Sequence, residues 1–135
     1  MQLYSPNSPE AMSRVVAMMI VADAHIDDRE IAILDKLNAF TALGISRKDF
    51  MAVARDYCAD LGRLAEADGS TTLLDPARTD QIIGAVTDPA QRLVVAKLLM
   101  AVVAADHHHG EGELVLFAHI LDVWSLTREQ VANAA

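Results

Sequence analysis

The apolar residues of this chain recur with the period of an α-helix. Met12, Val15 and Met19 follow steps of three and four residues, and most of the residues between them are apolar as well. This pattern predicts a helix that is buried on most of its faces. The run from Leu93 to Ala105 has the same character. We therefore expect two largely buried helices to pack together at the centre of the fold.

Helices with a single apolar face are predicted between and after these two. Most helix starts, including those of the two central helices, are indicated by Ser or Asp before Pro, or by Asp or Thr three residues before Glu or Gln, the spacing of a capping box. Ser46 is the predicted N-cap of a further helix. The seven predicted helices begin near residues 9, 27, 46, 76, 89, 111 and 127, and Gly44 ends the second of them. No segment alternates strictly between apolar and polar residues, so no sheet is expected.

Residues 11–50 and 94–131 have the pattern of two copies of one unit, an apolar helix followed by a short acidic hinge and a second helix. An offset of 83 residues places Asp23 over Asp106, Arg14 over Lys97, Ala22 over Ala105 and Glu30 over Glu113. After a shortening of two residues, Ile45-Ser46-Arg47 matches Leu126-Thr127-Arg128. The chain is therefore predicted to contain an internal pseudo-twofold repeat.

Size and composition agree with this pattern. A length of 135 residues is sufficient for one domain with a sizeable core. An apolar content of 53% against 22% charged residues is typical of a folded globule. Ala, Leu, Val and Met supply most of the apolar content, which favours helices over strands. The expected fold is all-α: a compact single-domain bundle of about seven helices.

Charge and cysteine content narrow the functional classes. A net charge of −8 disfavours nucleic-acid binding, because the chain would repel phosphates, and favours cations or basic partners. Cys58 is the single cysteine of the sequence, which excludes an internal disulfide and fits a reducing compartment. No segment is long and apolar enough to span a membrane, and the N-terminus lacks the pattern of a secretory signal. We therefore expect a cytoplasmic protein.

Most of the negative charge lies in the two hinges. Residues 23–30 and 106–113 each carry a formal charge of −3. Asp23 and Asp106 follow apolar helices, and the negative end of a helix dipole disfavours a carboxylate there by about 0.3–1 kcal/mol. Hydrogen bonds from backbone amides, a basic side chain or a bound cation would compensate this cost. The amide-capping alternative also accounts for Asp27 and Glu30 as a capping box.

The cation alternative defines the candidate site. Hard oxygen ligands that converge on one point suit Ca²⁺, Mg²⁺ or Mn²⁺ in preference to Zn²⁺. A mixed site with histidine is conceivable in the second hinge, although adjacent side chains of the run His107-His108-His109 point to alternate sides. The candidate ligands are Asp23, Asp27, Asp28 and Glu30 in the first hinge and Asp106, His109, Glu111 and Glu113 in the second.

The hinge sequences 22–30 and 105–113, and the turn Leu43-Gly44-Ile45-Ser46, resemble the recurring motif of the TerB-like family. This family includes the tellurite-resistance protein TerB and the N-terminal domain of DjlA co-chaperones. The resemblance spans nearly the whole chain and implies a seven-helix bundle with a pseudo-repeat. It also implies an acidic cation-binding cluster, which corresponds here to Asp23 and Glu30 and to Asp106 and Glu113. The first hinge matches the motif better.

Three functional hypotheses follow. The first is a non-catalytic module that binds a divalent cation and docks a protein partner, as in stress-response and membrane-linked assemblies of the tellurite-resistance type. The second is a metal-independent acidic scaffold or oligomerisation module, with a homodimer among its forms. A metal-dependent hydrolase is least favoured, because no nucleophile is set beside a base and no Gly-rich loop is present to hold phosphate.

Overall fold

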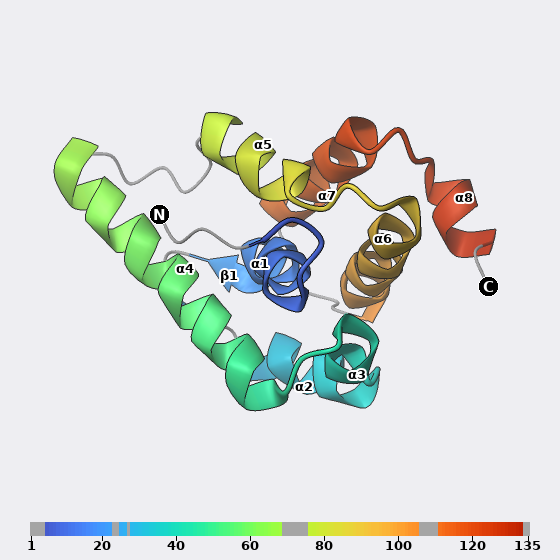
Figure 1. The fold of residues 1–135 in the computed structure, drawn as a ribbon, viewed down its shortest axis with the longest axis horizontal. Helices are drawn as coiled ribbons and strands as arrows, with labels where there is room; N and C mark the ends of the chain where they lie inside the picture. The colour runs from blue at the N-terminus through green and yellow to red at the C-terminus, as the bar shows by residue number, and fades with distance from the viewer. Residues whose placement is uncertain (1–4, 23–24, 27, 69–75, 106–110, 134–135) are drawn as a thin grey trace.

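The structure, a computed structural model, describes residues 5–22, 25–26, 28–68, 76–105 and 111–133. Within these ranges the chain forms eight helices and one minimal pair of strands (Figure 1). In chain order the elements are α1 (Pro9–Ile20), β1 (Val21–Ala22), β2 (His25–Ile26), α2 (Asp28–Lys36), α3 (Ala39–Leu43), α4 (Arg47–Asp68), α5 (Pro76–Gly84), α6 (Pro89–Ala105), α7 (Glu111–Val123) and α8 (Arg128–Asn133). The all-α class is confirmed.

The eighth helix arises because the second predicted helix is divided. The apolar pattern continues from α2 into α3, but the backbone turns at Leu37 and Asn38. Asn38 has a φ of 56°, in the left-handed region that asparagine tolerates better than most residues. This conformation ends α2, and the amide of Ala42 bonds to the Asn38 carbonyl oxygen as α3 begins. The break therefore changes the direction of the chain while both helices keep their apolar faces inward.

The strand pair lies in the first hinge and was not expected from the sequence. β1 and β2 are antiparallel, with Val21 opposite Ile26 and Ala22 opposite His25. Two residues on each side are too few for an alternating pattern to show in the sequence. The expectation of no sheet was therefore wrong at this one place. The pair folds the hinge back on itself between α1 and α2.

Helix α1 is the centre of the fold. Every residue from Ala11 to Ile20 is buried. Figure 1 shows α1 nearly end-on, with α4 on one side and α6 on the other, and α4 and α6 are its most extensive contacts. α3, α5 and α7 also contact it. The predicted packing of α1 against α6 is thus confirmed. Within the described part of the chain, no helix has the length and apolar content required to cross a bilayer.

The two copies of the repeat end their second helices with the same backbone cap. The amide of Ile45 bonds to the carbonyl oxygen of Phe40 at 3.0 Å, and that of Leu126 bonds to Leu121 at 2.8 Å. These bonds lie 81 residues apart, the offset expected after the shortening. Each spans the left-handed residue of a Schellman-type cap, which stops the helix and satisfies its last carbonyl groups.

The helices that follow these caps also start in the same way. The amide of Asp49 bonds to Ser46 Oγ and that of Gln130 to Thr127 Oγ1, at 3.1 and 3.0 Å. In the second copy Gln130 Oε1 also accepts from the Thr127 amide at 2.8 Å, which completes the predicted capping box. The repeat is therefore present in hydrogen bonds as well as in apolar spacing.

The first helices of the two copies are joined at their N-termini by Asn7. The side-chain Oδ1 of Asn7 accepts from the backbone amides of Thr87 and Asp88 at 2.7 and 2.9 Å. The backbone amide of Asn7 donates to the Ala85 carbonyl oxygen at 2.9 Å. Gln91 also joins this network, because its Nε2 donates to the Asn7 carbonyl oxygen at 3.1 Å. Asp88 still caps α6 through a bond from the Ala90 amide.

Candidate functional site

Glu30 is the best-defined residue of the candidate site. It lies in the first turn of α2, directly after the strand pair, and only 2% of its surface is exposed. Helical spacing explains this burial, because Ile31 and Leu34 on the same helix are in the core, and α2 packs against α3 and α6. The position that the capping-box pattern predicted at the helix end is therefore inside the fold.

Asp28, two residues earlier, is exposed. Two carboxylates within one helical turn thus differ in environment, since about 200° of helix rotation separates them. Asp28 meets water, whereas Glu30 has lost most of its hydration. Of the two, Glu30 is the residue whose charge requires compensation from the protein or from a ligand.

A buried carboxylate is costly unless opposite charge or hydrogen bonds compensate it. The buried charged side chains within the described residues are Arg14 on α1, Glu30 on α2 and Asp60 on α4. Each of the three engages other groups of the protein. Two acids and one base are therefore held in the interior, in a chain whose surface is also acidic.

The other first-hinge candidates, Asp23 and Asp27, lie outside the described residues. The backbone on either side of them is described, and the pairing of Ala22 with His25 brings the two arms of the hinge together. The hinge begins where α1 ends at Ile20 and leads into α2 at Asp28. The structure therefore positions the ends of the predicted ligand segment, and Glu30 beside it.

The second hinge is described only at its end. Asp106 and His109 lie outside the described residues, and so do the side chains of Glu111 and Glu113 in the first turn of α7. α7 begins at Glu111, 83 residues after α2 begins at Asp28, as the repeat predicts. Within the part of the chain that is described, no group of three or more His, Cys, Asp or Glu side chains is arranged to hold a metal ion.

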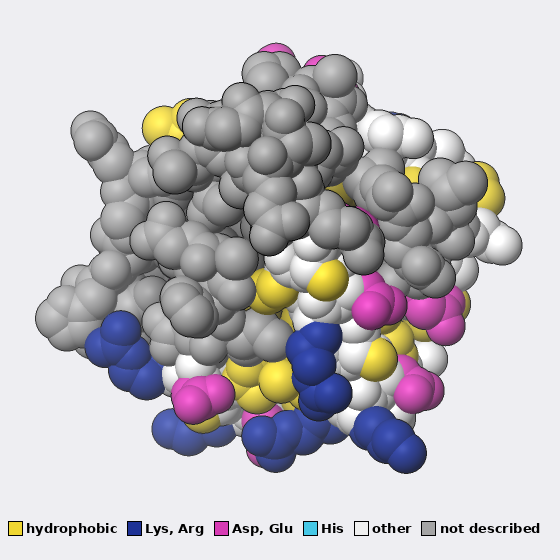
Figure 2. All heavy atoms as spheres, turned by 90° about the vertical axis from the view of Figure 1, so that its left-hand side faces the viewer, with side chains coloured by type: hydrophobic (Ala, Val, Ile, Leu, Met, Phe, Trp, Pro, Cys, Tyr) yellow, Lys and Arg dark blue, Asp and Glu magenta, His cyan; other side chains and the backbone are white. Residues whose placement is uncertain are grey.

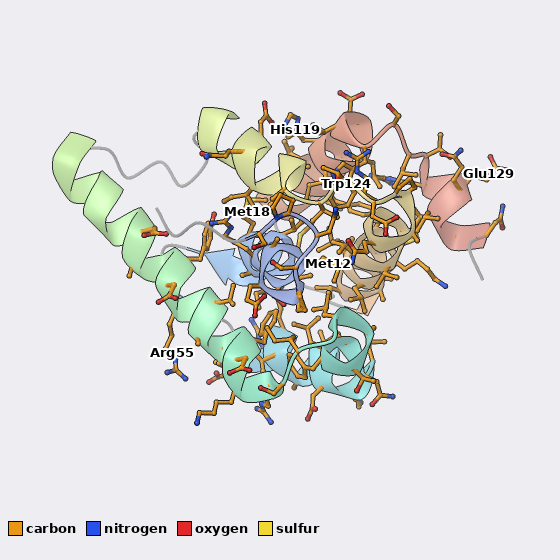
Figure 3. The ribbon with its side chains drawn as sticks, in the orientation of Figure 1. Met12, Met18, Arg55, His119, Trp124 and Glu129 are labelled. Carbon is orange, nitrogen blue, oxygen red and sulfur yellow. The ribbon has the colours of Figure 1, made fainter. Side chains whose placement is uncertain are left out.

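Three polar contacts of the structure had no signal in the sequence. His119 Nε2 lies 2.7 Å from Asp80 Oδ1 and links α7 to α5, with both side chains partly exposed (Figure 3). Trp124 Nε1 donates to the Ile83 carbonyl oxygen at 3.2 Å. The third is the network around Asn7. All three join residues about 40 or more positions apart, a separation at which helical periodicity carries no information.

Cys58 is half-buried on α4 and does not belong to the candidate site. Burial raises the pKa of its thiol above the ordinary value of 9.0, because the thiolate would lose hydration. The reactive form of the thiol is therefore scarce at neutral pH.

We compared the chain with protein-family models, curated proteins and solved structures, and none of them matched.

Proposed function

We propose that this chain is a non-catalytic module that binds a divalent cation at its first hinge and docks a protein partner, in the manner of TerB-like stress-response domains. The cation would be Ca²⁺, Mg²⁺ or Mn²⁺ in preference to Zn²⁺, because the expected ligands are carboxylate oxygens. Asp23, Asp27 and Glu30 would supply these oxygens. In the second copy Asp106 and Glu113 correspond to Asp23 and Glu30, Glu111 corresponds to Asp28, and Asp27 has no acidic counterpart because Gly110 takes its place.

The burial of Glu30 is the observation that carries this proposal. An exposed carboxylate in a first helical turn is sufficiently explained by the helix dipole, as for Asp28. Glu30, at 2% exposure, would gain nothing from water and would be stabilised by a cation at the adjacent hinge. Such binding would also offset the unfavourable position of Asp23 after α1. One ion would thus compensate several locally unfavourable charges.

Compensation of Glu30 by Arg14 alone is the competing explanation. Removing one partner of a buried ion pair costs about 3–5 kcal/mol, whereas replacing both partners by apolar or neutral groups is often nearly neutral. The two explanations therefore differ in the double variant Arg14→Met with Glu30→Gln. Recovery of stability in the double variant, together with a wild type that binds no cation, would favour the internal pair.

Calorimetric titration of the metal-free chain with Ca²⁺, Mg²⁺, Mn²⁺ and Zn²⁺ tests the proposal directly. We expect heat of binding for at least one of the first three ions, and a higher thermal midpoint in its presence, since a ligand at 100 times its Kd stabilises by about 2.7 kcal/mol. Glu30→Gln should weaken binding by about tenfold or more. Asp35→Asn is the matched control, because Asp35 is an exposed acid on the same helix.

Absence of heat for all four ions, with an unchanged thermal midpoint, would reject the cation site. Equal weakening by Glu30→Gln and Asp35→Asn would indicate non-specific attraction to an acidic protein. The partner half of the proposal is tested separately by binding measured with and without chelator. Association that persists unchanged in chelator would favour the metal-independent scaffold.

A further inference from the structure

Helix α4 carries a repeated pair of charges on its outer surface. Lys48-Asp49 and Arg55-Asp56 are basic–acidic doublets seven residues apart, and all four side chains are exposed. Seven residues are about two helical turns, so both doublets face the same direction. This regularity is not explained by the packing of α4, because its buried residues lie on the opposite side.

Charges on one helix usually pair at a spacing of three or four residues. None of the four side chains has an opposite charge at that spacing, since the positions concerned hold apolar residues, Gly, Ser or the like-charged Asp60. Within the described part of the chain, no ion pair engages any of the four side chains. Among the described residues the doublets thus have no opposite charge to pair with, and only Asp49, in the first turn of α4, has a favourable interaction with its own helix dipole.

The charges are also sorted by sign across the face. A helix turns by about 100° per residue, so Lys48 and Arg55 lie about 40° and 60° to one side of Ala52. Asp49 and Asp56 lie about 60° and 40° to the other side. Ala52 and Ala59, both exposed, occupy the middle. The face therefore has one basic flank and one acidic flank, with small residues between them.

This face is open in the fold. α4 runs along one edge of the molecule and its inner side contacts α1 and β2 (Figure 1). In Figure 3 the side chain of Arg55 extends away from the bundle. Figure 2, which looks onto this edge, shows Lys and Arg side chains gathered in its lower part with acidic and apolar side chains between them. A helix of another molecule can reach the face.

We propose that a second copy of this chain packs along this face, with the two α4 helices parallel and related by a twofold axis that runs alongside them. Rotation about that axis places the basic flank of one helix opposite the acidic flank of the other, and it leaves each residue at the same level along the helix axis. Lys48 then meets the partner's Asp49, and Arg55 meets the partner's Asp56. Each contact is made twice, as an isologous interface requires. Ala52 and Ala59 face their own copies and let the helices approach closely.

The charge pattern selects this arrangement against the antiparallel one. A twofold axis perpendicular to the helices would keep each flank on its own side, so that basic would face basic and acidic would face acidic. Like charges set opposite each other disfavour a pairing, and the flanking charges of paired helices set their orientation in this way. The proposal does not depend on the cation site, and chelator should leave the dimer intact.

Exposed ion pairs contribute little individually. We therefore expect a weak dimer, with a dissociation constant on the order of 100 μM. Sedimentation equilibrium over a range of concentrations, with chelator present, measures the dissociation constant. A wild type that stays monomeric at several times that concentration would reject the proposal.

Charge reversal provides the decisive test. Asp49→Lys with Asp56→Lys lowers the magnitude of the net charge from −8 to −4 and so reduces general repulsion, yet it makes both flanks basic. The dissociation constant should rise about tenfold or more. Lys48→Asp with Arg55→Asp should have the same effect by making both flanks acidic. An equimolar mixture of the two variants should form a heterodimer, because their faces are complementary.

Asp122→Lys with Glu129→Lys is the matched control, since it makes the same change in net charge at exposed positions of α7 and α8. This control should dimerise at least as well as the wild type. Circular dichroism establishes whether each variant is folded. If a charge-reversed variant does not fold, the neutral double variant Lys48→Gln with Arg55→Gln takes its place. Reversed variants that dimerise like the control, or a mixture that stays monomeric, would overturn the proposal.

Discussion

Gly44 and Ser125 hold the same place in the two copies of the repeat, and both have positive φ, at 74° and 56°. Each residue ends a helix, and the amide after it bonds back over one turn to Phe40 or Leu121. Glycine adopts this conformation without strain, whereas a residue with a Cβ pays about 1 kcal/mol. The two copies therefore share one cap at different conformational cost.

Gly44→Ala should lower the free energy of unfolding by about 1 kcal/mol, and Ser125→Gly should raise it by a similar amount. The effect at Gly44 is conformational, because an added Cβ would meet only Pro9 Cγ at an ordinary 3.9 Å. Urea unfolding followed by circular dichroism measures both. Gly84→Ala is the matched control, with ordinary φ and open space around its Cβ, and it should not destabilise. Equal effects at Gly44 and Gly84 would contradict this explanation.

Asn7→Ala should destabilise the chain by about 1–3 kcal/mol, since it removes the acceptor for the amides of Thr87 and Asp88 and forces alanine into a φ of 63°. Asn7→Gly separates the two causes, because it removes the side chain without the backbone strain. It should cost less than Asn7→Ala but still destabilise. Stability equal to the wild type in both variants, measured by urea unfolding, would show that the network contributes nothing.

Trp124→Phe should destabilise by about 1–2 kcal/mol, because it removes the buried bond to Ile83 and leaves space beside the ring. The Ile83 carbonyl oxygen keeps a bond from Val86, which limits the loss. The guanidinium of Arg92, 5.9 Å from the indole centroid, would retain a ring to pack on. Thermal unfolding followed by circular dichroism at 222 nm provides the measurement, because the helical backbone dominates the signal at that wavelength. A thermal midpoint equal to that of the wild type would contradict the expected loss of stability.

Cys58 should react slowly with a thiol reagent at neutral pH, because burial raises its pKa and keeps the thiol protonated. The unfolded thiol ionises first as pH rises through its ordinary value of 9.0, so stability should fall above that pH and be unaffected below it. Rates with and without urea, and unfolding at several alkaline pH values, test the two statements. Cys58→Ser should lose the alkaline decrease. Fast labelling of the folded chain would refute the argument.

Local sequence chemistry predicted much of this fold. The capping box of Thr127 and Gln130 and the helix end at Gly44 were readable because each depends on residues within one turn. The break at Asn38 was not, since the apolar spacing runs through it and a single left-handed residue decides it. The burial of Glu30 was also missed, because a capping-box glutamate is ordinarily at the surface.

The site was predictable as a pair of acidic hinges but not as a geometry. Helical spacing places Asp28 and Glu30 on different sides of α2, but it does not say which of the two is buried until the side of α2 that faces the core is known. The link between Asp80 and His119, and that between Asn7 and Thr87, depend on how distant helices approach each other. Contacts of that kind follow from the packing of the whole chain, which no short window of sequence contains.

The Asn7 network also constrains when the fold can form. Its partners at Thr87 and Asp88 lie about 80 residues further along the chain. During synthesis α1, with its apolar surface, must therefore wait until more than half of the chain has been made before its start can be anchored and α6 can cover it. In the N-terminal half alone α4 can cover one side of α1, but the side of α1 that faces α6 should stay exposed until the second copy of the repeat emerges.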